Sequence, residues 1–105
     1  MIKLYIGGAY QGQNALAQAE NPQAEIVFDF ERLVRGQADA AAFAAAFCDQ
    51  HPDAVITAQE IGCGIVPMDA EERAWREAAG RALCVVAQRA GAVVRVLCGV
   101  GVRIK

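Results

Sequence analysis

Residues 2–14 of the chain read IKLYIGGAYQGQN. The β-prone segment 2–6 ends in two glycines, and a helix-prone segment, QNALAQAE, begins at residue 13. Gly7 and Gly12 have the spacing of a phosphate-binding loop, in which backbone N–H groups curl around phosphate oxygens between a strand and a helix. This stretch therefore predicts a strand, a glycine-rich turn and a helix.

The two residues after the last glycine depart from that motif. A working loop continues with Lys, which neutralises the β and γ phosphates, and with Ser or Thr, which binds magnesium. This chain has Gln13 and Asn14 instead, and losing a charge-stabilising donor commonly costs roughly 10²- to 10³-fold in rate. Two interpretations remain open: a nucleotide site formed by Gly7, Gly8, Gly12, Gln13 and Asn14, or an ordinary strand-to-helix glycine turn.

The rest of the chain alternates strands with helices. Strands are expected at residues 2–6, 25–29, 54–58 and 93–98, and residues 102–105 either belong to the last strand or form a further closing strand. Helices are expected at residues 13–20, 37–50 and 69–91. In the last helix Asp69 is the expected N-cap and Glu72 completes a capping box, while Trp75, Ala79, Leu83 and Val86 form a buried stripe. The alternation predicts an α/β fold with a mainly parallel sheet flanked by helices.

Length and composition restrict the class of protein. A chain of 105 residues corresponds to one domain, residues 1–105. A net charge of -2 gives no electrostatic footprint for nucleic acid or for an anionic membrane. The sequence shows neither a long apolar run nor a signal-peptide pattern, so a cytoplasmic location without a membrane span is expected. The hydrophobic fraction of 55% on a short, Ala-rich chain suggests layers completed by a partner subunit.

The cysteines and the histidine do not form a recognisable metal motif. Cys48, Cys63, Cys84 and Cys98 are widely spaced, without a C-x-x-C pair, so reduced thiols are expected rather than zinc ligands or disulfides. His51 precedes a proline at a helix end, which favours a surface or capping role.

Two acidic residues follow predicted strands. Asp29 ends the second strand and Glu60 lies just past the third, so both can face the crevice at the carboxyl edge of a parallel sheet. A carboxylate there can hold magnesium or a water molecule, and these two are the candidate catalytic residues. A solvated strand-end carboxylate explains either residue equally well. Arg73 and Arg76 fit a solvated helix face or a contact to phosphate.

The carboxyl-terminal half carries an ordered set of motifs. These are Gln59-Glu60-Ile61-Gly62, Gly64-Ile65-Val66-Pro67, Arg73 with Arg76, Gly80-Arg81, and the segment Gly99 to Lys105. In this order and spacing they resemble the bifunctional adenosylcobinamide kinase/adenosylcobinamide-phosphate guanylyltransferase family of cobalamin biosynthesis. The opening loop is similar to that family's Gly-Gly-Ala-Arg-Ser-Gly-Lys-Ser loop at its glycines only.

The resemblance implies a P-loop NTPase-like fold, GTP or ATP with magnesium as cofactors, a corrinoid substrate and a homotrimeric assembly. It also places Asp29 on the magnesium side of the site. Family members are longer, and the absent portion normally carries the guanylyl-accepting His, a role that His51 does not take over because it lacks the surrounding motif. We therefore expect either a degenerate member with weak or no catalysis, or a noncatalytic homo-oligomeric binding or assembly protein derived from the family.

Overall fold

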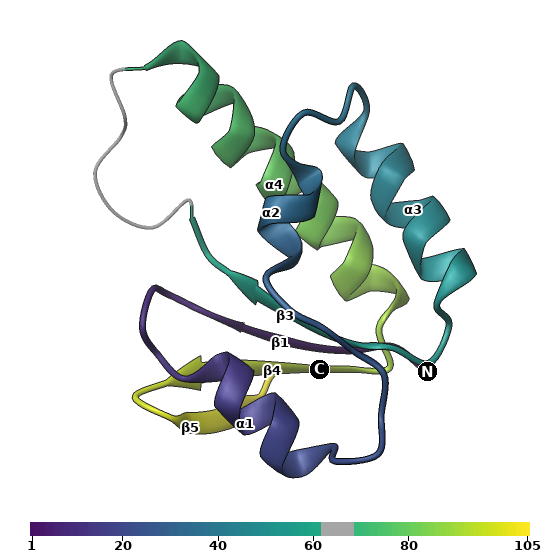
Figure 1. Cartoon of the computed structure of the whole chain (residues 1–105), viewed down its shortest axis with the longest axis vertical. Coiled ribbons are helices and arrows are strands. Elements are labelled where there is room, and N and C mark those ends of the chain that lie inside the picture. Colours follow the sequence, from purple (N-terminus) through teal and green to yellow (C-terminus); the bar gives the residue numbers. More distant parts are fainter. Residues whose placement is uncertain (62–68) are drawn as a thin grey trace.

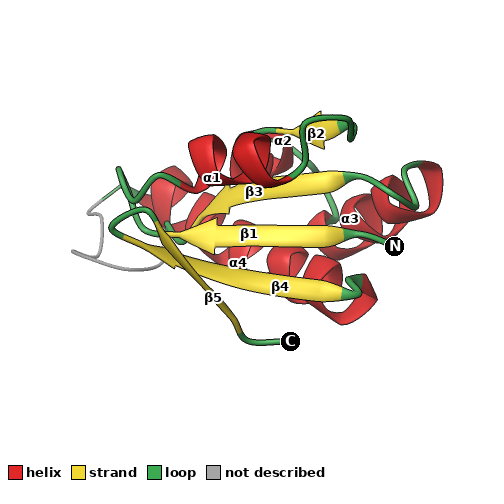
Figure 2. Ribbon diagram, turned by 90° about the horizontal axis from the view of Figure 1, so that it is seen from below, coloured by secondary structure: helices red, strands yellow, loops and turns green. Residues whose placement is uncertain are grey.

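The computed structural model describes residues 1–61 and 69–105. A five-stranded sheet with the order β2-β3-β1-β4-β5 lies at its centre (Figures 1 and 2). The strands are β1 (Lys3–Gly7), β2 (Ile26–Val27), β3 (Val55–Gln59), β4 (Ala92–Leu97) and β5 (Val100–Arg103), and the helices are α1 (Gln13–Glu20), α2 (Phe30–Val34), α3 (Ala40–Gln50) and α4 (Ala70–Arg89). β2 pairs with β3, β3 with β1 and β1 with β4, all in parallel, and β5 pairs antiparallel with β4. The predicted α/β fold with a mainly parallel sheet is confirmed.

The helices form a layer on each face of the sheet. In Figure 1, α1 lies below the sheet, and α2, α3 and α4 lie above it. Side chains of the central strand β1 alternate between these layers: Leu4 packs in the core with α4, whereas Tyr5 packs in a smaller cluster with Ala17 of α1. The central strands β1 and β3 are mostly apolar because helices cover both of their faces, whereas the edge strand β5 is exposed along its whole length.

The longest helix follows the predicted pattern. The Asp69 carboxylate accepts hydrogen bonds from the backbone N–H groups of Glu71 and Glu72, as an N-cap should. The Glu72 carboxylate, predicted to complete a capping box, pairs with Arg35. Of the predicted buried stripe, Ala79, Leu83 and Val86 are buried, with Ala82 beside them, whereas Trp75 is only partly buried.

The segment before α3 differs most from the prediction. β2 has two residues rather than five because the backbone of Asp29 is left-handed, with φ of 58°, which ends the strand. The short helix α2, which the sequence pattern did not indicate, follows directly. It delivers Phe30 to the rings of Phe43 and Phe47 on α3, with centroids 5.9 and 5.2 Å apart.

None of the helices in the described part of the chain combines the length and the apolar character that crossing a membrane requires.

Candidate functional site

The loop between β1 and α1 lies at the carboxyl edge of the sheet. Gly12 is the N-cap of α1 with φ of 88°, a conformation that favours glycine. Gly7 is required for another reason, since an added Cβ would lie 2.6 Å from the carbonyl oxygen of Val96 on β4. At Gly8 an added Cβ would come no closer than 3.8 Å to Gln11. Two of the three predicted loop glycines are therefore needed by the fold itself.

The start of α1 offers backbone donors to an anion. The first N–H groups of a helix have no intrahelical acceptor, and the helix dipole adds partial positive charge there. Gly12 has no side chain with which to cap them. This end of α1 has the electrostatics of a phosphate-binding terminus.

Gln13 stands where a phosphate-binding loop has its lysine, and its side chain turns inward. The residue is only 8% exposed. Its Nε2 lies 3.3 Å from each of three carbonyl oxygens, those of Gly7, Gly8 and Ala58. The amide thus ties the loop to β1 and to β3, and it brings no charge to the site.

Asn14 and Asp29, both predicted site residues, lie together. Asn14 Nδ2 donates to Asp29 Oδ1 over 3.2 Å. The other amide atom, Asn14 Oδ1, is buried and has no hydrogen-bond partner. The backbone of Asp29 is held by β3, because its N–H donates to the fully buried hydroxyl of Thr57 over 3.0 Å. An unpaired buried oxygen beside a carboxylate is an unusual arrangement, since such atoms normally find a partner.

Glu60 lies at the end of β3, next to the loop. Its backbone N–H donates to the carbonyl oxygen of Gly7 over 2.8 Å, which fastens the loop to β3. Its carboxylate lies 3.9 Å from the guanidinium of Arg95. Glu60 also lines an apolar groove of about 380 Å³, with Ile6 and Leu83 among the other lining residues.

Glu31 is a buried carboxylate that the sequence analysis missed. The residue is 2% exposed, and one carboxylate oxygen accepts the backbone N–H of Gln59 over 2.8 Å. Burial raises the pKa of Glu31, the hydrogen bond from Gln59 opposes that rise, and the nearby Asp29 carboxylate adds to it. Its position two residues after Asp29 could have indicated a site residue. However, two adjacent charged residues, Glu31 and Arg32, are typical of a solvent-exposed segment.

A second contact holds the loop from the other side. The backbone oxygen of Gln11 accepts the N–H of Gly99 over 2.7 Å, and Gln11 Oε1 accepts the N–H of Cys98 over 2.7 Å. Cys98 and Gly99 form the turn between β4 and β5, with φ values of 52° and 76°. The loop is thereby braced against the hairpin turn by both the backbone and the side chain of one residue.

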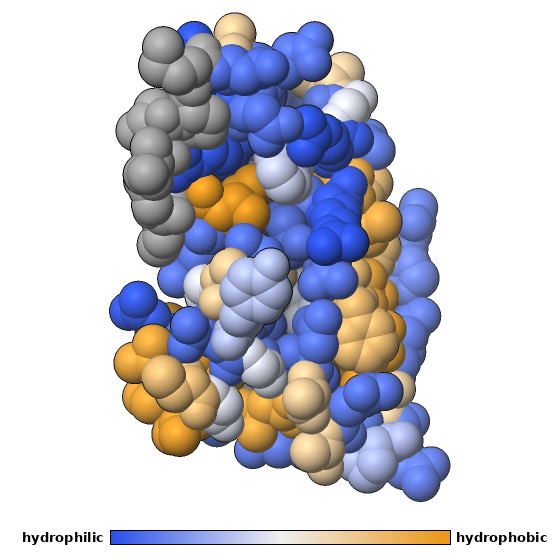
Figure 3. Space-filling model, turned by 60° about the vertical axis from the view of Figure 1, so that its left-hand side comes forward, coloured by the Kyte–Doolittle hydropathy of each residue, from blue (hydrophilic) through white to orange (hydrophobic). Residues whose placement is uncertain are grey.

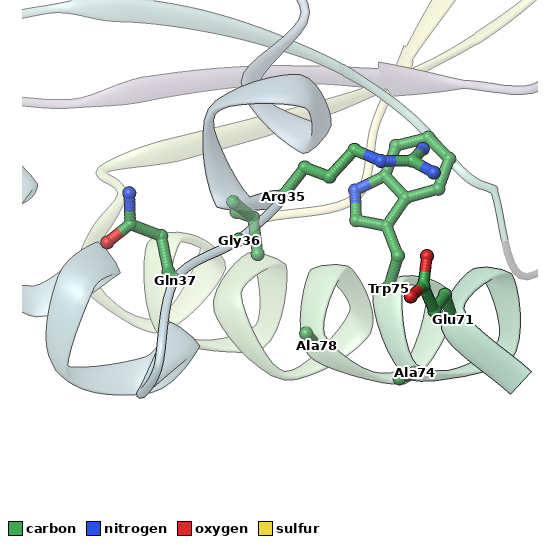
Figure 4. A pocket seen from close by; sticks show the side chains of 8 residues that line it. Arg35, Gly36, Gln37, Glu71, Ala74, Trp75 and Ala78 are labelled. Carbon is green, nitrogen blue, oxygen red and sulfur yellow. The ribbon is translucent and has the colours of Figure 1, made fainter.

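A separate cavity of about 440 Å³ lies between α2 and α4 (Figure 4). The Arg35 guanidinium stacks on the Trp75 ring, 4.5 Å from its centroid. The indole Nε1 donates to the backbone oxygen of Glu31 over 2.8 Å. Trp75 thus fixes α2, and with it Glu31, to α4, and we assign these contacts a packing role.

The remaining predicted residues are dispersed. Arg73 is exposed, and Arg76 lines the same groove as Glu60. His51 is the C-cap of α3, with Nδ1 3.2 Å from the Glu25 carboxylate. Cys48, Cys84 and Cys98 are free thiols. Cys63 and the Gly64-Ile65-Val66-Pro67 motif lie outside the described residues.

The surface around the loop is mixed in character. Figure 3 brings this side of the molecule forward, and there hydrophilic residues (blue) separate several hydrophobic groups (orange). Within residues 1–61 and 69–105, no group of three or more His, Cys, Asp or Glu side chains is arranged to hold a metal ion. Any cation at Asp29 would have to draw most of its ligands from water or from a bound phosphate.

Comparison with protein families gives a match that covers almost the whole chain. The sequence model of a family described as cobinamide kinase / cobinamide phosphate guanyltransferase matches residues 7–104. No curated protein matches the chain. The matched range includes the loop, Asp29, Glu31 and Glu60.

Proposed function

Because the chain belongs to the cobinamide kinase / cobinamide phosphate guanyltransferase family, we propose that it acts in cobalamin biosynthesis as a member that binds nucleotide weakly and transfers no phosphoryl group at a measurable rate. The inward-turned amide of Gln13 is the observation that carries this proposal. Its donors already face three carbonyl oxygens of the protein. Residues 7–14 contain neither Lys nor Arg, so the loop itself has no cation to neutralise developing phosphate charge.

Asn14 and Asp29 fit a magnesium ion by their donor chemistry. Magnesium prefers oxygen ligands, and Asp29 supplies a carboxylate. The two ends of the Asn14 amide are interchangeable by rotation, and rotation would turn the unpaired oxygen toward Asp29 in place of the N–H group. When bound, the ion would screen phosphate charge. The residues of this chain would then only hold the ion and orient the anion at the start of α1.

The geometry supports binding of GTP or ATP through backbone contacts alone. The free N–H groups at the start of α1 suit a phosphate group, and Gln11 and Glu60 brace the loop around them. A neutral loop holds a triphosphate less tightly than one with a lysine, because hydrogen bonds to charged groups contribute about 1.5–3 kcal/mol.

Guanylyl transfer through His51 is not part of this proposal. His51 precedes β3, whereas the loop follows β1, and the two strands are parallel. His51 therefore lies at the amino ends of the parallel strands, whereas the loop lies at their carboxyl ends. Its ring stacks on Phe47 with centroids 4.4 Å apart and faces Glu25, which supports a capping role.

An alternative proposal is a noncatalytic binding or assembly protein that uses the family fold without nucleotide. The Gln13 amide, which bonds to the protein itself in place of a ligand, favours it. In both proposals the chain is cytoplasmic and self-associates, and the family resemblance implies three-copy units, whether or not such units pair further. Binding of nucleotide or of a corrinoid separates the two.

The test combines titration with an activity assay. Purified protein is titrated calorimetrically with GTP, ATP and cobinamide in the presence of magnesium, and phosphorylation of cobinamide is followed with labelled nucleotide. We expect weak nucleotide binding and no phosphorylation by the wild type. The double variant Gln13→Lys with Asn14→Ser should bind nucleotide about tenfold more tightly or better, since it restores a charged donor and a hydroxyl ligand.

Gln18→Lys is the matched control, because it adds the same charge to an exposed position of the same helix. It should leave nucleotide affinity nearly unchanged. Robust phosphorylation of cobinamide by the wild type would overturn the proposal. A double variant that binds no better than the control would show that the loop has lost its capacity to hold phosphate, and would favour the alternative.

A further inference from the structure

β5 forms one edge of the sheet and carries an exposed apolar row. Among residues 1–61 and 69–105, its one partner strand is β4 (Figure 2). Val100, Val102 and Ile104 are 64, 57 and 61% exposed. Since side chains alternate along a strand, these three share one face, and Gly101 and Arg103 share the other. An open strand edge flanked by apolar side chains is a typical site of strand addition.

The two faces of β5 are distinguishable. An added Cβ at Gly101 would lie 2.8 Å from Leu16 of α1, so the Gly101 face is the one that α1 covers. The row of Val100, Val102 and Ile104 therefore lies on the face that carries α4. Ile104 lines the same apolar groove as Leu83 of α4, and in the described part of the chain the row otherwise stays open to solvent.

Along β5, every second residue points its backbone N–H and C=O groups away from β4, toward the open edge of the sheet. Ile104 donates its N–H inward to the carbonyl oxygen of Val93, which also accepts the N–H of Lys105, while the Val93 N–H donates to the carbonyl oxygen of Lys105. Ile104 and Lys105 together therefore lie opposite Val93, the next position in the β4–β5 register. In an antiparallel ladder the residues that bond to one neighbour alternate with those that face away. Val100 and Val102 therefore bond inward like Ile104, whereas Gly101 and Arg103 direct their N–H and C=O groups outward.

These features select one self-complementary register. If two copies of β5 run antiparallel about a two-fold axis at Val102, Gly101 lies opposite Arg103 of the other copy, with the outward-facing groups of each in position to bond. Val102 then faces Val102, and Val100 faces Ile104. Each arginine meets a glycine rather than another arginine, so no like charges are opposed.

We propose that β5 pairs with β5 of a second copy of this chain in that register, joining two sheets across a two-fold axis. The other edge strand, β2, has only two residues, so β5 of one copy finds no strand of matching length at the far edge of another. The contact is therefore isologous and closed rather than open-ended.

This inference is independent of the proposed function, since neither the loop nor Asp29 contributes to the edge. A two-fold contact pairs copies whatever other contacts they make. An assembly of three copies built through other surfaces would be doubled to six by it. The expected mass of the assembly is therefore an even multiple of the chain mass.

The test uses opposite charges at the axis, in the full-length chain. Val102→Glu and Val102→Lys each place two like charges directly across the interface, and each should weaken the pairing by about tenfold or more. Analytical ultracentrifugation over a range of concentrations should then show half the wild-type mass for either variant. An equimolar mixture should regain the wild-type mass, because Glu faces Lys across the axis. Leu33→Glu, at an exposed apolar position of α2, is the control and should keep the wild-type mass.

Recovery on mixing separates a lost interface from a misfolded chain, since two misfolded chains would not restore each other. The proposal is overturned if the wild type has an odd number of copies, if the Val102 variants keep its mass, or if mixing fails to restore it. Nucleotide titration of the same samples reports separately on the proposed function.

Discussion

At the scale of single residues, the most specific prediction concerns the buried carboxylate of Glu31. Burial raises its pKa above the ordinary value of 4.5, so the folded state favours the protonated form. The stability that this group contributes is fully present below pH 4.5 and is lost as the pH rises through the higher folded-state pKa. Glu31→Gln should therefore flatten the pH dependence of the free energy of unfolding, measured by urea denaturation from pH 4 to about 8.

Glu77→Gln is the matched control, because Glu77 is exposed on α4. It should preserve the wild-type slope of stability against pH. Equal slopes in the wild type and in Glu31→Gln would contradict the assignment of a raised pKa to the buried carboxylate.

A second prediction at this scale concerns the contact of Gln11 with the turn between β4 and β5. Gln11→Ala removes the acceptor of the Cys98 N–H and keeps the backbone acceptor of the Gly99 N–H. The expected loss of stability is about 1 kcal/mol. Amide hydrogen exchange should accelerate more at Cys98 than at Gly99, whereas the exposed Gln18→Ala on α1 should change neither. Equal acceleration at both amides would mean that the side chain does not brace the turn.

The residues of the site were predictable to different degrees. Gly7, Gly12, Gln13 and Asn14 follow from a motif that is contiguous in sequence, and they meet in one loop. Asp29 could be placed beside them because parallel strands end at one edge. Glu31 could not, because it becomes buried only when the left-handed turn at Asp29 starts a helix of five residues, too short to show periodicity.

At the scale of elements, the close packing of α3 against α4 depends on small side chains. Ala44 of α3 is fully buried in the same cluster as Ala82 and Val86 of α4. Ala44→Leu should lower the free energy of unfolding by about 1–3 kcal/mol, because the extra atoms have no room. Ala46→Leu, two residues away and exposed on the same helix, should be nearly neutral, since leucine is also a good helix former. Equal effects in a denaturant titration would refute this account of the interface.

Element bounds also show what local sequence determines. α1 has the predicted bounds 13–20, because glycine and Asn21-Pro22 mark its two ends. α3 begins at Ala40 rather than at residue 37, because Asp39 caps it by accepting the N–H of Ala42. Gln37 and Asp39 both precede the alanine run, and of the two Asp39 is the better N-cap residue, because its short side chain reaches the backbone N–H groups of the first turn.

At the scale of the whole molecule, self-association should couple stability to concentration. If two copies pair through β5, the apparent Tm of the wild type rises as the protein concentration is raised from about 5 to about 500 μM. Val102→Glu should lose that dependence, and Leu33→Glu should keep it. A wild-type Tm that is constant over this range would argue against association coupled to folding.

The strand order has a consequence for how the chain folds. β1 is the central strand and the first to be synthesised, and its register partners begin at Val55 on one side and Ala92 on the other. It must remain unpaired until more than half of the chain has been made, with Leu4, Tyr5 and Ile6 exposed meanwhile. Closing such long loops is slow compared with forming helices, and unpaired apolar strands are prone to aggregate. The nascent chain is therefore expected to depend on chaperones during synthesis, because the central position that gives β1 a partner strand on each side leaves it without either partner until both have been made.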